Sequence, residues 1–315
     1  RVHESFVTTV SGYNKFVKWV RKNSCDMEES AWLFCGENTG DYSKPLCNYL
    51  YGRGYDVWLE NAKCIKDASG LRRLKSDKAD SAMIAEYAMR NYDRAELYIP
   101  LNESLSQLRE LFLFRQMLVR QKHGFQVRRG EKNRAMEKSS VKTAISQIGR
   151  HMVNECNKQI EKVERRIKDI IDGDEELKRT YELITTIPGI GTQNAVCLLT
   201  FTNNFTRFGY NARKIACYYG IAPFGRDSGT SVHSDPHVHY MANRMLKSML
   251  TQAALASIRC CAPIAHYYHR LIALGKKKQV ALNNVKNKLI HIITAMVKNN
   301  LSFNPGYTNI NKFIA

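Results

Sequence analysis

Long apolar runs and paired cysteines are both missing from the sequence, and each absence excludes a class of protein. No run of about eighteen apolar residues occurs and no apolar secretory segment opens the chain, so we expect no membrane-spanning helix. The nine cysteines are scattered, without a C-x-x-C pair or the Cys/His spacing of a zinc finger. Cys35, Cys197 and Cys217 lie in apolar runs, where free cysteine behaves as a small hydrophobic residue. We therefore expect a soluble protein of a reducing cytoplasm.

Acidic residues are few for a chain of this size. The 315 residues include 29 Asp and Glu against 48 Lys and Arg, which leaves a formal net charge of +19. A field of that sign concentrates polyanions, so nucleic acid is the expected partner. With 44% hydrophobic and 24% charged residues the composition is that of a globular protein, and the length suffices for two domains.

Strand-like and helical segments alternate along residues 1–100. The strand-like segments are 5–10, 31–35 and 55–59, and the helical ones are 12–22, 43–51 and 77–91. This alternation predicts an α/β sheet with helices on its faces.

The pattern changes over residues 101–176, which contain no proline up to Asp172. Apolar residues recur there at spacings of three and four, at Ile145, Ile148, Met152, Cys156, Ile160, Val163, Ile167 and Ile170. The spacing predicts two long antiparallel helices in a coiled coil, which packs either across an oligomer interface or as a hairpin closed on itself. The rest is predicted to be mainly helical, at 177–185, 192–201, 211–220, 242–260, 263–274 and 279–299, with a tail from 303.

Three carboxylates form the first candidate site. Glu37 follows a buried strand, where open α/β sheets place their ligands. Asp77 and Asp80 stand at i and i+3 on a predicted helix and so share a face. Carboxylate oxygens are ligands that Mg²⁺ selects, and two such ions can flank a phosphodiester. Lys75 and Lys78 interleave with the acids and suit a phosphate, although such a helix can also carry acids that only face water.

A glycine-rich turn before a helix forms the second candidate site. Gly189 and Gly191 lie in Ile-Pro-Gly-Ile-Gly at 187–191. Glycines at a helix start expose amide N–H groups that favour phosphate, as in helix-hairpin-helix DNA binders. The alternative is a plain turn.

A serine segment forms the third candidate site. Ser228 is followed by Gly229 in a predicted loop, and its hydroxyl could meet a phosphate while Arg226 stabilises the developing charge. Three histidines follow, but their spacing matches no metal template and zinc is disfavoured: His233, His237 and His239.

Taken together, these motifs resemble those of the insertion-sequence transposases of family 110 and the related Piv-type DNA invertases. Residues 37–40 read E-N-T-G, similar to the family's E-x-T-G, and residues 75–85 are similar to its K-x-D-x-x-D-A-x-x-I-A. The turn at 187–191, the serine segment at 227–229, Asn243-Arg244 and Gly275-Lys276 follow in the family's order. The resemblance covers nearly the whole chain.

The resemblance implies an RNase H-like (RuvC-like) domain whose DEDD tetrad binds Mg²⁺, and a helical transposase domain whose serine forms a phosphoserine link to DNA. It implies Glu37, Asp77 and Asp80 as three of the four catalytic, metal-binding acids and Ser228 as the nucleophile. It also implies donor and target DNA, a structured noncoding bridge RNA as guide, a homodimer or homotetramer, and a bacterial cytoplasmic, nucleoid-associated location. The residues expected to bind nucleic acid are Lys75, Lys78, Gly189, Gly191, Arg226, Arg244, Lys247 and Lys276.

The sequence departs from the family pattern in three places. The tetrad's first aspartate lies on an opening strand in the family and has no counterpart in this sequence. Asp41 and Asp56 lie in other elements and cannot replace it. We therefore expect either that about twenty residues are missing before Arg1 or that the chain has lost catalysis. Ala242 and Lys247 stand where the family commonly has glycine and arginine. Ser231 lies near Ser228, but the neighbours of Ser228 favour the latter.

The expected domains are 1–100 (RuvC-like, first strand missing), 101–176 (coiled coil), 177–302 (transposase) and 303–315 (tail). Two other functions remain open. One is a Holliday-junction-resolvase-like nuclease, in which the acids hydrolyse DNA without Ser228. The other is a catalytically incomplete DNA- or RNA-binding protein that serves as a repressor or RNA chaperone.

Overall fold

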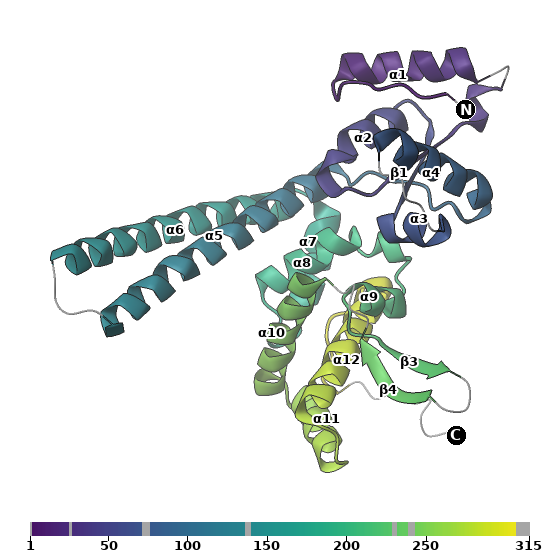
Figure 1. The fold of residues 1–315 in the computed structure, drawn as a ribbon. Helices are drawn as coiled ribbons and strands as arrows, with labels where there is room; N and C mark the ends of the chain where they lie inside the picture. Colours follow the sequence, from purple (N-terminus) through teal and green to yellow (C-terminus); the bar gives the residue numbers. More distant parts are fainter. Residues whose placement is uncertain are drawn as a thin grey trace, which may run out of the picture. The chain divides into compact units, whose positions relative to one another are not determined.

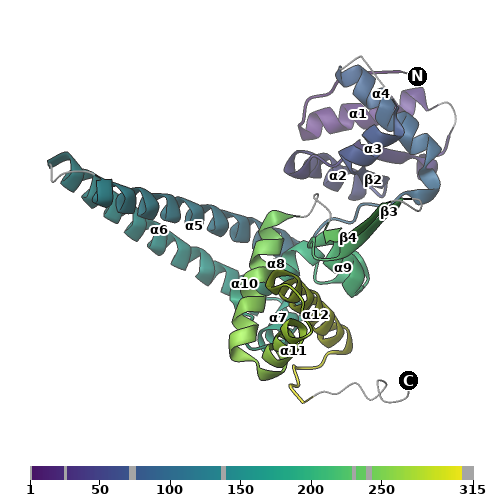
Figure 2. The same cartoon turned by 60° about the horizontal axis from the view of Figure 1, so that its bottom comes forward.

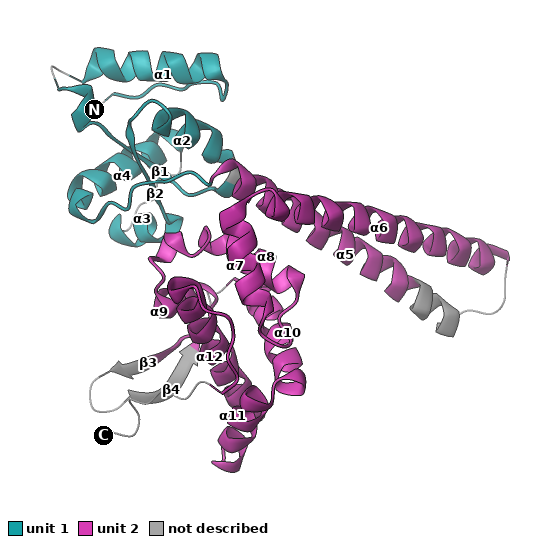
Figure 3. Cartoon of the chain, turned by 180° about the vertical axis from the view of Figure 1, so that it is seen from behind, with its two compact units in different colours: residues 1–101 teal, residues 102–315 magenta. Residues whose placement is uncertain are grey.

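The chain divides into two compact units, residues 1–101 and 102–315 (Figure 3). The computed structural model describes residues 2–24, 27–70, 76–135, 140–228, 232–238 and 243–306. The predicted tail from 303 therefore lies outside the described residues beyond 306, and each unit is described by itself.

The first unit places two parallel strands between helices. Its elements, in order, are α1 (Val10–Asn23), β1 (Leu33–Glu37), α2 (Lys44–Tyr51), β2 (Asp56–Glu60), α3 (Ala62–Ala68) and α4 (Asp77–Arg90). β1 and β2 pair in parallel, from Leu33 opposite Asp56 to Glu37 opposite Glu60. Parallel strands need a crossover connection, which α2 supplies.

The two faces of this strand pair carry different helices. Side chains alternate between faces along a strand, so Val57 and Trp58 point in opposite directions. Val57 packs in a buried cluster with Val17 of α1 and Leu50 of α2. On the opposite face, the Trp58 ring lies 5.4 Å from the ring of Tyr87 in α4. The unit is thus a helix–strand–helix sandwich, as the alternation of segments predicted.

The strand predicted at residues 5–10 is wrong. The structure has no strand in residues 2–9, and α1 begins at Val10, where Thr9 accepts a hydrogen bond from the Gly12 amide at 3.2 Å. The Phe6 ring packs 5.5 Å from that of Phe16 and 5.7 Å from that of Trp19. Contacts with α1 and a helix cap therefore overrode the local preference for a strand.

The second unit is mainly helical (Figure 1). Its helices are α5 (Glu103–Ala135), α6 (Ser140–Asp172), α7 (Glu175–Thr185), α8 (Thr192–Thr202), α9 (Ala212–Tyr218), α10 (Arg244–Cys260), α11 (Ala262–Ala273) and α12 (Lys278–Asn299). Two strands that the sequence did not predict, β3 (Pro223–Ser228) and β4 (Val232–Val238), form an antiparallel pair. We call this pair the serine hairpin. Every residue of α8 from Ala195 to Thr202 is buried, so α8 is the centre of this unit's core.

The helices α5 and α6 lie side by side along their length (Figures 1 and 2). Cys156, Ile160 and Val163 are buried as the spacing predicted. Ile148 and Met152 are 64% and 36% exposed, because Val153 takes the buried position next to them. The apolar stripe is therefore covered only on the part of α6 nearer α7.

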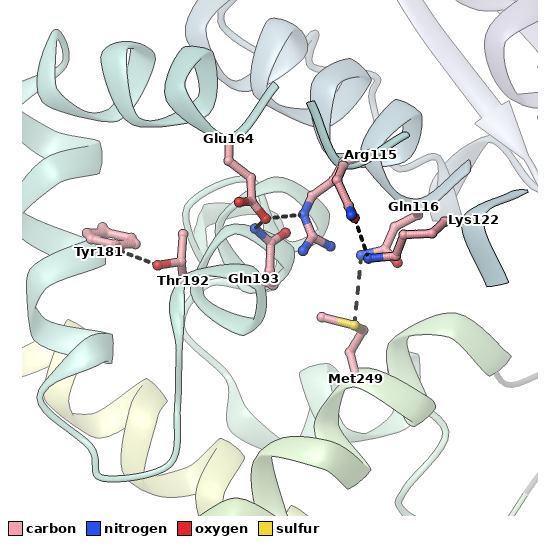
Figure 4. A network of polar contacts seen from close by, with 9 residues as sticks. Arg115, Gln116, Lys122, Glu164, Tyr181, Thr192, Gln193 and Met249 are labelled. Atoms are coloured by element: carbon pink, nitrogen blue, oxygen red, sulfur yellow. Dashed lines mark hydrogen bonds and ion pairs between the residues drawn. The ribbon is translucent and has the colours of Figure 1, made fainter. Parts of the chain in front are cut away.

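A polar network fastens the helix pair to the core of this unit (Figure 4). The Nε of Arg115 in α5 donates to Oε1 of Glu164 in α6 at 2.7 Å, and Nε2 of Gln193 in α8 donates to the same oxygen at 3.3 Å. The Arg115 side chain is only 17% exposed. Partial burial strengthens such a charged contact, so the network resists sliding of α5 and α6 against α8.

The turn between α7 and α8 is held tightly against α10. Gly189 has a φ of +91°, and a Cβ built on it would lie 2.3 Å from the backbone N of Ser257. Gly191 ends the same turn with a φ of −94° and has open space around its Cβ position. Only Gly189 therefore requires glycine for steric reasons.

We expect Gly189→Ala to destabilise the protein by roughly 3 kcal/mol, because the new methyl group meets backbone at a strained φ. The matched control is Gly191→Ala, which we expect to cost under about 1 kcal/mol at a helix N-cap. Denaturant unfolding curves of both variants measure the difference, and equal losses would contradict the packing role of Gly189.

Candidate active site

Two glutamates end the two parallel strands side by side. Glu37 is the last residue of β1 and Glu60 the last of β2, and they are register partners. Glu37 is exposed and Glu60 is half-buried. The Asn38 amide donates to the Glu60 carbonyl oxygen at 2.8 Å and extends the pairing by one residue. Because parallel strands end at the same edge, both carboxylates belong to one edge of the strand pair.

The two predicted aspartates lie in the first turn of α4. Ser76 caps this helix, and its Oγ accepts from the Ala79 amide at 3.2 Å. Asp77 is exposed and Asp80 is half-buried, and both complement the positive end of the helix dipole. The helix α4 packs against β1, the strand that ends at Glu37. Lys78 is exposed, whereas Lys75 lies outside the described residues.

The sequence reasoning missed Glu60. Its Oε2 accepts from the Tyr87 hydroxyl at 3.1 Å, and its Oε1 accepts from the Asn61 amide at 2.6 Å. Burial, and then the Glu60 carboxylate, raise the pKa of Tyr87 to about 12. One signal was available: the segment 56–60 is a strand that ends in glutamate, as the segment 33–37 is.

The acids do not form a closed metal site within the described part of the chain. Carboxylate oxygens suit a hard divalent ion. However, no three Asp, Glu, His or Cys side chains among the described residues are grouped closely enough to hold one. Glu37, Asp77 and Asp80 therefore have the chemistry of metal ligands, but they do not form a three-ligand group among the described residues.

The structure places Ser228 at the end of a strand, not in the predicted loop. Ser228 is the last residue of β3 and pairs with Val232 of β4. The pairing of residues 223–228 with 232–238 explains the difference, because a loop prediction from single residues does not register a cross-strand partner. The structure describes only the backbone of Arg226, Ser228, His233 and His237. Gly229, Ser231 and His239 lie outside the described residues.

The remaining predicted contacts with nucleic acid lie on helix ends. Arg244 is exposed at the start of α10, where the Asn243 side chain accepts from the Met245 amide at 3.1 Å. Lys247 is half-buried one turn later, and Lys276 is exposed before α12. Gly191 is exposed at the start of α8.

We expect Ser76→Ala to lower the free energy of unfolding by about 1 kcal/mol, because the first turn of α4 loses its cap. The same turn carries Asp77 and Asp80, so their placement should loosen with it. Ser76→Thr keeps an acceptor oxygen and should behave as wild type in thermal and denaturant unfolding. Identical curves for the alanine and threonine variants would show that the cap contributes nothing.

Comparison with known proteins gives two family matches. Residues 2–129 match a family model of DEDD transposases of the IS110 type, and residues 181–270 match that of the transposase IS116/IS110/IS902 family. The first match implies an RNase H-like fold and the use of a divalent metal, and the strand pair with helices on both faces accords with that fold. None of the helices in the described residues is long and apolar enough to cross a membrane.

Two relatives match along most of the chain and a third matches along part of it. The chain is 23% identical to the pilin gene-inverting proteins of Moraxella bovis and Moraxella lacunata over 303 residues, which is 95% of this chain and 89% of each relative. It is 33% identical to an uncharacterized 43.6 kDa protein of insertion element IS110 from Streptomyces coelicolor over 116 residues, which is 37% of this chain and 28% of that protein. The chain therefore belongs to the IS110 family of transposases and is a DNA-rearranging enzyme.

Proposed function

We propose that this transposase cleaves and rejoins DNA strands through Ser228. The supporting observation is the position of Ser228 as the last residue of β3, paired with Val232 of β4, within the segment that matches the transposase family. In the proposed step the Ser228 oxygen bonds to phosphorus, the bond from phosphorus to the leaving deoxyribose oxygen breaks, and the serine proton passes to that oxygen. Attack of a strand's hydroxyl on the phosphoserine then reverses the step and joins the new strands. The energy of the phosphodiester is conserved throughout.

Glu37, Asp77 and Asp80 are the proposed ligands of the divalent ion, with Mg²⁺ as the ion. The family match supports the use of a divalent metal, and carboxylate oxygens are its usual ligands. The proposed contacts with DNA phosphates are Lys75, Lys78, Gly189, Gly191, Arg226, Arg244, Lys247 and Lys276. The net charge of +19 supports binding of a polyanion.

The helix pair α5–α6 is the proposed oligomer contact. Its exposed apolar side chains include Phe114, Met117 and Ile148, which are 47%, 42% and 64% exposed. A second copy would cover them in a coiled coil and yield a homodimer or homotetramer. We also propose a structured bridge RNA as guide; the basic composition of residues 121–142 supports a second polyanionic partner.

We expect Ser228→Ala to abolish a covalent protein–DNA adduct while DNA binding stays intact, because only the attacking oxygen is lost. The measurement is gel electrophoresis under denaturing conditions after incubation with the ends of the insertion element. Ser231→Ala is the matched control and should keep the adduct.

Three results would contradict the proposal. Loss of the adduct in Ser231→Ala alone would move the nucleophile to that serine. Cleavage by Ser228→Ala without any adduct would indicate the resolvase-like nuclease. Binding by the wild-type chain without cleavage would indicate a binding protein.

We expect Asp77→Asn and Asp80→Asn to weaken Mn²⁺ binding and to reduce metal-dependent cleavage by about a hundredfold or more, because each removes a charged ligand. Asp93→Asn changes an exposed acid in a separate turn and is the control. Calorimetric titration with Mn²⁺ measures binding without reference to activity. Unchanged Mn²⁺ affinity in both variants would exclude these aspartates as ligands.

A further inference from the structure

A buried lysine of α12 contacts α10 near Lys247, whose charge acts on it. Lys286 of α12 is only 6% exposed, and its Nζ lies 3.5 Å from Oγ1 of Thr251 in α10. That hydroxyl in turn donates to the carbonyl oxygen of Lys247 at 2.7 Å. Burial, and then repulsion from Lys247, lower the pKa of Lys286 from 10.5 to about 8.

This arrangement is unfavourable for the protein alone. Among the described residues no ion pair includes either lysine. An ammonium group with little water and no anion destabilises a fold, and buried lysines usually pair or extend their heads to solvent. The Lys286 ammonium instead contacts α10. A positive charge held in this way is suited to an anion that arrives from outside.

The lysine pair lies at the base of the serine hairpin. Asn283, one turn before Lys286 on α12, donates to the carbonyl oxygen of Ile221 at 2.8 Å, two residues before β3 begins. Lys247 lies one turn into α10, the helix that follows β4. The chain therefore enters β3 beside α12 and passes from β4 into α10, the two helices that carry the lysines.

We propose that Lys286 and Lys247 form a phosphate-binding site at the base of the serine hairpin, which holds a phosphodiester of the DNA strand presented to that hairpin. The choice of DNA rests on the proposed function, because Ser228 would attack DNA. RNA offers the same phosphodiester chemistry, so the test has to separate the two. A phosphate oxygen would accept from both ammonium groups and supply a negative charge, which the described residues give neither lysine in an ion pair.

The first test is binding by Lys286→Met, with Lys298→Met as the control. Lys298 is exposed on the same helix and the variant makes the same charge change. We expect Lys286→Met to bind a random-sequence DNA duplex about tenfold or more weakly than the wild type. The slope of log affinity against log salt concentration should fall by about the contribution of one released counterion. Lys298→Met should bind as wild type, and a single-stranded RNA of equal length should be affected less than the DNA.

Equal DNA affinity and salt dependence for Lys286→Met and Lys298→Met would overturn the site. A loss confined to RNA would overturn the assignment to DNA. The adduct assay tests the proposed serine chemistry separately from this site. If the wild-type chain forms no adduct but Lys286→Met still loses DNA affinity, the serine chemistry is wrong and the phosphate-binding site stands.

The second test is the stability of the free protein. Because the folded chain holds Lys286 at a pKa near 8 and the unfolded chain near 10.5, the unfolded state binds more protons between these values. The wild-type stability, measured relative to Lys286→Met, should therefore rise from pH 8 to pH 10.5. We also expect Lys286→Met to melt at or above the wild-type temperature near pH 7, whereas a lysine needed for folding would lower it.

A third measurement uses the wild-type chain and needs no variant to fold. The Lys286 side-chain signal is followed by NMR through a pH titration, with and without the DNA duplex. A bound phosphate favours the charged form, so the pKa should rise in the complex. An unchanged pKa in saturated complex would overturn the site.

Discussion

The parallel pairing of β1 with β2 is the constraint on which the first unit depends. It sets Glu37 opposite Glu60 at one edge, and it leaves one face for α1 and α2 and the other for α4. The helix α4, whose first turn carries Asp77 and Asp80, is held on the strand pair by the contact of the Tyr87 ring with that of Trp58. A single register thus decides which carboxylates can approach one another. It also explains why Glu60, which the sequence pattern does not distinguish from other strand residues, lies at the same end of the strand pair as Glu37.

The second unit depends on close packing around α8. Gly189 brings the preceding turn onto α10, and the Arg115–Glu164–Gln193 network fastens the long helix pair to the same core. The serine hairpin leaves this core between α9 and α10, with its base beside α12. Support at the base suits the proposed nucleophile, Ser228, since a reacting group gains most when its scaffold is ordered before the substrate binds. A buried lysine at that base destabilises the free chain, and the proposed phosphate would offset this cost.

Helices were the most predictable part of the fold. The segments 43–51, 77–91, 192–201 and 279–299 form helices with nearly those bounds, because apolar spacing and caps act over a few residues. The strand at 5–10 was wrong and the strands β3 and β4 were missed, because strand formation depends on packing and pairing context more than on the local sequence. In the same way, the exposure of Ile148 and the burial of Val153 depend on the rotation of α6 against α5, which spacing alone leaves undetermined.

The sequence by itself determined the charge of +19 and the order of the family motifs, and it supplied the acids and the serine proposed for the site, since these are properties of residue type and spacing. Only the tertiary structure decided that Glu60 is the neighbour of Glu37, that Gly189 is needed for contact with α10, and that Lys286 is buried against Thr251 of α10. Each of these joins segments distant in sequence. The local sequence indicates the chemistry that a residue offers. Packing and desolvation act across the whole fold and determine which residues it contacts.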